Sequence, residues 1–335
     1  MKAVRIALVG CGGMAHWHAE QMKKVSELEV VALADPNQEN LRKLADKHFP
    51  AAQKFENFDA LLRSIDELDA VLFATPHTLH FDQARTALES GLHVLVEKPM
   101  VTSSDHAYEL WQTVKRTGKL LGITFQSPYT AEFAYLAKER DAGRLGRPML
   151  LTGWLSQSWM VGTRGSWRQD PALSGGGQMY DSGAHLLNAF MWLMNEPVVE
   201  AGCFYDKLGS PVDINGVAIV RFASGALGSI TIGGHCPAYR TEIAIQTDTM
   251  LIVTDQYGGK LELHGPGGKK LYPHVEPLSE GGGTPHHNFV NAILGREPLR
   301  APIRYGVLLS TLMDALYESA DTGKIVLVKP VPAEI

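Results

Sequence analysis

Cysteine is scarce in this sequence of 335 residues, which has only Cys11, Cys203 and Cys236. These three lie far apart and form no C-x-x-C pair, so they indicate neither a disulfide framework nor a cysteine zinc site, and they fit a reducing compartment. Long hydrophobic runs are also missing near the start, where the apolar stretch from Val4 soon meets a glycine turn. That stretch is too short for a signal peptide or a membrane span. We therefore expect a cytoplasmic protein with no membrane partner.

An excess of positive charge is absent as well. The chain has 31 Lys and Arg against 36 Asp and Glu, which gives a formal net charge of -5, and the basic residues are scattered. Binding of nucleic acid requires a cationic surface, so the composition argues against it and favours a small-molecule partner. The hydrophobic share of 45% is typical of a globular protein, and the length favours two domains.

Short β-branched runs alternate with helical stretches up to about residue 125. The runs predicted as strands are 4–9, 30–34, 70–74, 93–97 and 120–125. The stretches predicted as helices are 14–24, 38–48, 79–90 and 105–117. This alternation is typical of a doubly wound parallel sheet with helices on both faces. We expect residues 1–125 to form an N-terminal Rossmann domain.

The pattern changes from residue 126 onward, where strands dominate. The expected helices are 131–142, 182–194, 285–294 and 306–319. The expected strands are 216–222, 226–233, 242–247, 250–254 and 325–328, most of them joined by short turns. Such neighbouring strands form antiparallel sheets. Residues 126–335 are therefore predicted to form a C-terminal α+β domain with a large, mostly antiparallel open sheet, which binds the substrate.

A glycine-rich segment follows the first predicted strand and matches G-x-G-x-x-A at the start of a helix. Glycine there allows a tight turn and close approach of a pyrophosphate to the helix N-terminus. Asp35 ends the second strand, where an acidic side chain binds the adenosine ribose and repels a 2′-phosphate. Pro36 follows instead of a cation, so we expect NAD and consider NADP less suitable. The alternative is a glycine turn that binds no dinucleotide. The residues expected to contact the cofactor here are Gly10, Gly12, Gly13, Met14 and Asp35.

Polar residues also follow three later strands at their carboxyl ends, where open α/β sheets bind ligands. The further cofactor contacts expected there are Thr75, Pro76, His80, Glu97, Lys98 and Gln126. A lysine beside the nicotinamide can hydrogen-bond the reacting oxygen and stabilise charge that develops on it. A lysine that is only solvated is the alternative for Lys98. Tyr129 is a candidate for binding a substrate hydroxyl.

The order Gly-x-Gly-Gly-Met, Thr-Pro-x-x-x-His and Glu-Lys-Pro resembles the glucose-fructose oxidoreductase, inositol dehydrogenase and rhizopine catabolism family, or Gfo/Idh/MocA. The second half carries the similar run Gly175–Gly177, followed by Asp181, His185 and Asn188 in the spacing Asp-x-Gly-x-His-x-x-Asn. The tail from His287 also resembles the family. The resemblance covers most of the chain and implies an oxidoreductase with the two domains described above.

The resemblance implies that Lys98 and His185 flank the substrate carbinol. His185 then accepts its proton, with Asp181 as an electrostatic or substrate-binding partner. If the segment is helical, Asp181, His185 and Asn188 share one face. A histidine exchanges protons near neutrality, although a capped helix with a buried histidine is the alternative. Asn188 stands where the family has Asp, which keeps a hydrogen-bonding group and removes a charge.

Aromatic and basic residues gather between these two motifs. Indole rings stack on sugar C–H faces, and arginine binds hydroxyls or carboxylates, so we expect a sugar pocket here; core or interface packing is the alternative. The substrate contacts expected in addition to Lys98, Asp181 and His185 are Tyr129, Trp154, Trp167 and Arg168. His286 and His287 are adjacent and point to different sides of a helix, so we expect no metal site.

These patterns and the resemblance together imply an NAD(H)-dependent sugar or polyol dehydrogenase. It would transfer a hydride between nicotinamide and a secondary hydroxyl or ketone of a sugar, glycoside or cyclic polyol. One alternative is a family member that uses bound NAD for glycoside cleavage without net redox change. Another is a non-catalytic NAD-binding regulator that senses sugars. The family resemblance further implies a homodimer or homotetramer assembled through the open face of the C-terminal sheet.

Overall fold

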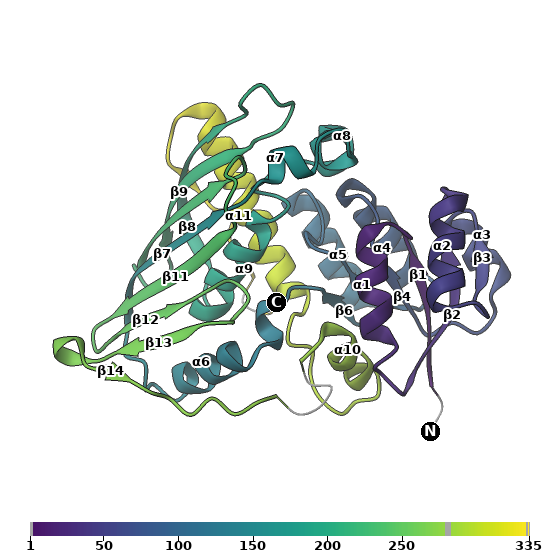
Figure 1. Ribbon diagram of the computed structural model, residues 1–335, viewed down its shortest axis with the longest axis horizontal. Helices are drawn as coiled ribbons and strands as arrows, with labels where there is room; N and C mark the ends of the chain where they lie inside the picture. The colour runs from purple at the N-terminus through teal and green to yellow at the C-terminus, as the bar shows by residue number, and fades with distance from the viewer. Residues whose placement is uncertain (1–2, 279–282, 333, 335) are drawn as a thin grey trace. The chain divides into compact units, whose positions relative to one another are not determined.

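The computed structural model describes residues 3–278, 283–332 and 334, and the chain divides into two compact units (Figure 1). Among the described residues, the first unit comprises 3–101, 105–124 and 283–303, and the second comprises the others. The expected domains, 1–125 and 126–335, differ from this division because residues 283–303 return to the first unit. Helix α10 (Pro285–Ile293) carries Phe289 and Val290, which are buried in the core of the first unit.

The first unit contains a six-stranded parallel sheet in the order β3-β2-β1-β4-β5-β6, which confirms the predicted Rossmann fold. The strands are β1 (Val4–Val9), β2 (Leu28–Ala34), β3 (Gln53–Phe55), β4 (Ala70–Phe73), β5 (His93–Val96) and β6 (Leu121–Ile123). The main helices of the Rossmann segment are α1 (Gly13–Met22), α2 (Gln38–His48), α3 (Phe58–Ser64), α4 (His80–Glu89) and α5 (Ser104–Thr117). The strand order reverses between β1 and β4, where such sheets bind their ligands.

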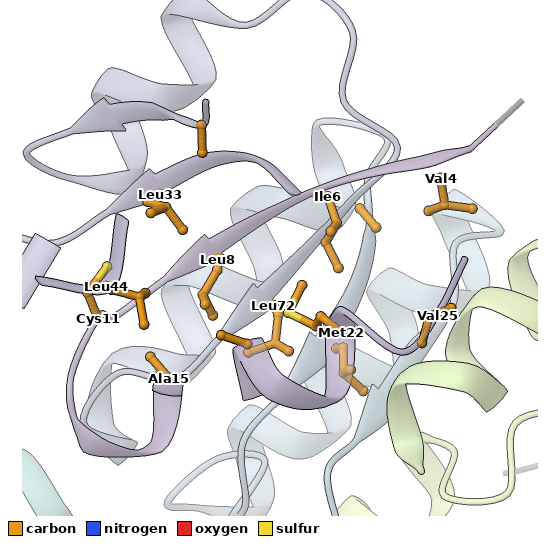
Figure 2. Packing of buried hydrophobic residues seen from close by; sticks show 14 of the residues in the cluster. Val4, Ile6, Leu8, Cys11, Ala15, Met22, Val25, Leu33, Leu44 and Leu72 are labelled. Carbon is orange, nitrogen blue, oxygen red and sulfur yellow. The ribbon is translucent and has the colours of Figure 1, made fainter. Parts of the chain in front are cut away.

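The core of the first unit fixes strand β1 against helix α1. Ile6 and Leu8 of β1 are buried with Met22 of α1, and all three are among the side chains shown in Figure 2. Burying one such side chain stabilises the fold by roughly 1.5–3 kcal/mol. Because both elements are anchored in this way, the glycine turn between them has a defined position.

The second unit contains a nine-stranded sheet in the order β14-β13-β12-β11-β7-β10-β9-β8-β15. Figure 1 labels most of these strands. All neighbours are antiparallel except β7 and β10, so the predicted, mostly antiparallel sheet is confirmed. Its strands are β7 (Pro148–Ser156), β8 (Val198–Asp206), β9 (Asn215–Phe222), β10 (Leu227–Gly233), β11 (Arg240–Thr247), β12 (Leu251–Thr254), β13 (Leu261–His264), β14 (Lys270–Leu271) and β15 (Val326–Leu327). The longer helices are α6 (Ala131–Asp141), α9 (Gly183–Met194) and α11 (Ile303–Thr322).

The predicted helices and strands are all present, with ends that lie within three residues of those predicted. The elements that were not predicted are helices α3, α7 (Trp159–Gly162) and α8 (Pro171–Ser174) and strands β3, β7, β8, β13 and β14. Strand β7 was not predicted as a strand, and only its end from Trp154 onward was interpreted, as part of an aromatic segment. A Cβ on Gly153 would lie 2.4 Å from the ring of Phe190 in α9, so the glycine lets this helix pack closely on the sheet. In the part of the chain that the structure describes, no helix has both the length and the apolar character needed to cross a membrane.

Candidate functional site

The glycine turn after β1 is constrained by the chain next to it. Gly10 has a φ of 90°, and a Cβ there would lie 2.5 Å from the carbonyl oxygen of Ala74. Only glycine tolerates both the backbone conformation and the close approach. A Cβ on Gly12 or Gly13 would meet nothing within 4 Å, so open space lies beside the turn.

The N-terminus of α1 and Asp35 fit a dinucleotide at this turn. The N-cap residue is Gly12, so no side chain caps the first N–H groups of the helix, which remain suited to a pyrophosphate. Asp35 follows β2 and accepts hydrogen bonds from the Cys11 N–H at 2.6 Å and the Asn37 N–H at 2.7 Å. The carboxylate is therefore fixed beside the turn, where it can also accept ribose hydroxyls.

Cys11 and Met14 differ in their exposure, although both belong to the turn region. Cys11 is buried, and burial, together with the charge of Asp35, raises the pKa of its thiol to about 12. The thiol is therefore protonated and unreactive at neutral pH. Met14 is exposed at the start of α1, beside the open space next to Gly12 and Gly13.

His80 connects the segments that follow β4 and β5. Its Nδ1 atom lies 2.8 Å from the Pro99 carbonyl oxygen, and its Nε2 atom lies 2.9 Å from the Thr75 carbonyl oxygen. Burial lowers the pKa of His80, while the two carbonyl groups oppose that shift. Both ring nitrogens thus face the main chain, and the hydroxyl of Thr75 donates to Gln83 at 2.6 Å. His80 holds the carboxyl ends of these two strands together, and a direct contact with the cofactor stays a prediction.

Glu97 and Lys98 follow β5, and the Glu97 carboxylate contacts both the His18 ring and the main chain of Lys98. Its Oε1 atom lies 2.7 Å from Nε2 of His18, and its Oε2 atom accepts the Lys98 backbone N–H at 3.1 Å. Burial alone would raise the pKa of Glu97, but the hydrogen bond with His18 and the nearby charges lower it to about 2. An ionised carboxylate therefore underlies the turn that carries Lys98.

Asp181 of the second unit is held by an indole and a guanidinium group. Its Oδ2 atom accepts hydrogen bonds from Trp159 Nε1 at 2.7 Å and from Arg168 Nε at 3.0 Å. The Arg168 guanidinium also lies over the ring of Trp167, 4.5 Å from its centroid. The structure thus joins Arg168 to Asp181 and places Trp167 beside Arg168, while their contact with a substrate stays a prediction. Sequence reasoning did not single out Trp159, because nothing in the local spacing separates it from the other tryptophans.

His185 lies in the first turn of α9 among aromatic rings. Its ring centroid is 5.3 Å from that of Tyr257 and 6.5 Å from that of Phe125. Burial and then the neighbouring Tyr239 raise the pKa of Tyr257. The helix begins at Gly183, so Asp181 precedes it, and the expected common helical face does not include Asp181. Tyr257 was not predicted, because it lies more than 70 residues from His185 in a turn with no motif of its own.

The segment that leads to Asp181 is fixed by the buried carboxylate of Asp213. Asp213 accepts the Gly177 N–H at 2.6 Å and the Met179 N–H at 2.9 Å, and it also accepts the Tyr317 hydroxyl. A Cβ on Gly177 would lie 1.9 Å from the Asp213 carbonyl oxygen. The glycine run therefore lets the chain pass close to Asp213, which sequence reasoning did not identify.

Trp154 lies in β7, and its expected contact with the substrate stays a prediction. Gly153 of β7 faces Phe190 of α9, and side chains alternate along a strand, so Trp154 lies on the opposite face of the sheet. There the Arg240 guanidinium is 5.3 Å from its ring centroid. Gln126 and Tyr129, in contrast, belong to the turn before α6 in the second unit, where Tyr129 is buried.

His286 and His287 begin α10, and only His286 is fully buried. Its Nε2 atom lies 2.8 Å from Nδ1 of His18. Across residues 3–278, 283–332 and 334, no three His, Cys, Asp or Glu side chains form a group that could hold a metal ion.

Two family models match this chain. An oxidoreductase family with an NAD-binding Rossmann fold matches residues 4–125, and the Gfo/Idh/MocA C-terminal domain matches residues 133–265. The chain belongs to the Gfo/Idh/MocA oxidoreductase family. It is accordingly an NAD(P)-dependent oxidoreductase, and its Rossmann unit binds NAD(P).

Curated relatives in the Gfo/Idh/MocA family share about a quarter of their residues with this chain. The D-glucoside 3-dehydrogenase of Escherichia coli is 25% identical, and the alignment covers 96% of each chain. The D-xylose 1-dehydrogenase (NADP(+)) 2 of Haloferax volcanii is 26% identical over 95% of this chain and 98% of its own. The structure of a levoglucosan dehydrogenase in complex with NADH has a TM-score of 0.87 at 20% identity, with 98% of this chain and 100% of that chain covered. This last likeness shows that the fold is shared.

Asn188, which stands in place of the family aspartate, is fully buried in α9. Neither atom of its amide has a hydrogen-bond partner among the residues that the structure describes. An unsatisfied buried polar group costs about 1–3 kcal/mol. We therefore expect Asn188→Leu, which keeps the size and removes the amide, to leave the free energy of unfolding unchanged or to raise it in urea titrations. A loss of 2 kcal/mol or more, on the same scale, would show that the amide is satisfied, for example by ordered water.

Proposed function

We propose that this protein is an NAD-dependent dehydrogenase that oxidises a secondary hydroxyl of a sugar, glycoside or cyclic polyol, or reduces the corresponding ketone. The observation that supports the proposal most is that Arg168 and Trp159 both bind the carboxylate of Asp181, which stands two residues before the helix that carries His185. An ion pair of this kind beside indole rings suits a ligand with several hydroxyl groups. Relatives named as D-glucoside, D-xylose and levoglucosan dehydrogenases support the same substrate class.

The proposed reaction assigns one step to each residue. His185 accepts the proton of the substrate hydroxyl, and Lys98 donates a hydrogen bond to the same oxygen and stabilises its developing charge. Asp181 orients the substrate or His185, held in turn by Arg168 and Trp159. NAD, when bound, supplies the acceptor for the hydride that leaves the carbinol carbon.

The test is the appearance of NADH absorbance with NAD or NADP against inositols, aldoses, sugar acids and glycosides. Turnover with one of these classes supports the proposal and identifies the substrate class. A complete lack of NADH formation, with NAD bound and a glycoside consumed, would instead favour cleavage without net redox change. Binding of NAD with no consumption of any compound would favour a regulator.

Cofactor choice forms part of the proposal, with NAD preferred to NADP because of Asp35. We expect Asp35→Ser to raise the ratio of kcat/KM for NADP to that for NAD by about tenfold or more, since a charge repulsion of about 1.4 kcal/mol corresponds to that factor. Serine removes the charge and keeps a hydroxyl oxygen on the side that faces the Cys11 N–H. Steady-state kinetics with both cofactors measures the ratio. An unchanged ratio would contradict the role of Asp35 in discrimination.

We also propose a cytoplasmic homodimer or homotetramer that is joined through the face of the sheet opposite α9. That face exposes apolar side chains, including Phe204, Val217 and Ile219 at 76%, 51% and 55%. A depression of about 480 Å³ lies beside Ile219 and Ile325. Exposed apolar patches of this kind mark protein interfaces. Ile219→Lys is expected to lower the molar mass measured by light scattering, and an unchanged mass would argue against this face.

A further inference from the structure

Three buried ionisable side chains form a row that ends beneath Lys98. His18 of α1, His286 of α10 and Glu97 after β5 are 0%, 1% and 8% exposed. Nδ1 of His18 lies 2.8 Å from Nε2 of His286. Nε2 of His18 lies 2.7 Å from Oε1 of Glu97. Burying such groups is costly unless they are hydrogen-bonded to one another. These three side chains are, so each one depends on the others for its position.

The direction of the hydrogen bonds in this row follows from the protons available. Glu97 is ionised, so Nε2 of His18 must donate to it. Burial holds the pKa of His286 well below its usual value, so this ring is neutral and carries one proton. A proton on Nδ1 of His286 would have no acceptor among the described residues, which costs about 1–3 kcal/mol. The proton therefore lies on Nε2, and His286 donates to His18, which donates to Glu97.

The far end of the row sets the main chain at Lys98. Oε1 of Glu97 is held by His18, which leaves Oε2 to accept the Lys98 N–H at 3.1 Å. The histidines thus fix the rotamer of Glu97 through Oε1. Through Oε2, the same carboxylate fixes the main-chain N–H of Lys98. His18 also belongs to α1, the helix that begins at the glycine turn, so the same row connects that helix with Lys98.

Trp17 shields this row. Its ring centroid lies 5.1 Å from that of His18 and 5.7 Å from that of His286. An apolar cover of this kind strengthens the hydrogen bonds beneath it, because the local dielectric constant is low. It also makes the loss of any one partner more costly.

We propose that His18 and His286 are positioning residues, which orient the Glu97 carboxylate and through it the turn that presents Lys98 to the substrate. The kinetic part of this inference rests on the proposed function of Lys98, whereas the hydrogen-bond row itself does not. Neither histidine touches the reacting atoms in this proposal. Their effect reaches the chemistry only through Glu97.

The kinetic test compares His286→Leu with His286→Gln and with His287→Leu, a control in the same helix outside the row. We expect His286→Leu to lower kcat about tenfold while the KM for NAD changes less than twofold, since small misplacements of a catalytic group can cost up to a hundredfold. Glutamine places an amide nitrogen near the position of Nε2, so His286→Gln should recover most of kcat. His287→Leu should match the wild type. A wild-type kcat in His286→Leu would overturn the proposal, as would equal losses in the leucine and glutamine variants.

A second measurement needs no substrate and separates this inference from the proposed function. Nitrogen-15 NMR of the histidine rings at neutral pH should show His18 and His286 with their protons on Nε2. In His286→Leu, the Nδ1 signal of His18 should shift, while His287→Leu should leave it in place. If the wild type turns over none of the compounds, the proposed function fails. The spectrum then tests the hydrogen bonds among His286, His18 and Glu97 independently. Unchanged His18 signals in His286→Leu would overturn it.

Discussion

Replacing His185 with asparagine is expected to lower kcat about a hundredfold or more, because general acid–base groups contribute roughly 10²–10⁴-fold. The ring of His185 lies 5.3 Å from that of Tyr257 and 6.5 Å from that of Phe125, between ring centroids, and asparagine cannot accept the proton that the imidazole accepts. Lys98→Met keeps roughly the length of the side chain and removes the ammonium group. It should lower kcat by a similar factor, because the charge that develops on the reacting oxygen is no longer stabilised. Single-turnover kinetics at saturating cofactor and substrate measures both.

The matched control for His185 is His264→Asn. His264 lies on β13 with a ring nitrogen 3.3 Å from Glu262, and it is partly exposed. Its replacement should leave kcat within twofold of the wild type. Fluorescence titration should show unchanged NADH binding in His185→Asn, whereas Lys98→Met, at an expected cofactor contact, is compared at saturating cofactor. A kcat within threefold of the wild type in either of these two variants would contradict the proposed role of that residue.

Gly177→Ala is expected to have the largest effect on stability. The added Cβ would lie 1.9 Å from the carbonyl oxygen and 2.7 Å from the nitrogen of Asp213, and both of these are main-chain atoms. Relief requires the chain to move away, which stretches the hydrogen bonds from the Gly177 and Met179 N–H groups to the Asp213 carboxylate. Overpacking and the loss of one charged hydrogen bond together cost roughly 3 kcal/mol or more. Urea unfolding followed by circular dichroism measures this loss.

The same substitution should also lower kcat, because the displaced segment leads directly to Asp181. Gly162→Ala is the control, since a Cβ on Gly162 meets nothing within 4 Å. Its free energy of unfolding should match that of the wild type within about 0.5 kcal/mol, the usual range for surface substitutions. If Gly177→Ala were as stable as Gly162→Ala, the close approach to Asp213 would not be a constraint in solution.

The Rossmann sheet and its glycine turn were predictable because their signals are local. Gly10, Asp35 and the strands around them follow one another at spacings set by a single βαβ unit. The same holds for the position of Glu97 and Lys98 after β5. For this part of the chain, periodicity and turn residues determine which side chains meet.

The supporting contacts of the candidate site were not predictable, since each joins positions that are remote in sequence. Asp213 reaches Gly177 across 36 residues, and His286 reaches His18 across 268. No periodicity specifies such pairs, because they depend on how strands and loops pack after the chain has folded. The face of the sheet on which Trp154 lies was likewise not predictable, because β7 was not identified as a strand.

The return of residues 283–303 to the first unit has a consequence for exchanging parts between relatives. A nucleotide-binding module cut at residue 125 would lack Phe289 and Val290, and their places in its hydrophobic core would face water. It would also lack His286, and His18 would lose its neighbour. A chimaera with a different cofactor preference therefore has to exchange two separate stretches of sequence. The segment that contains α10 has to come from the same relative as the glycine turn.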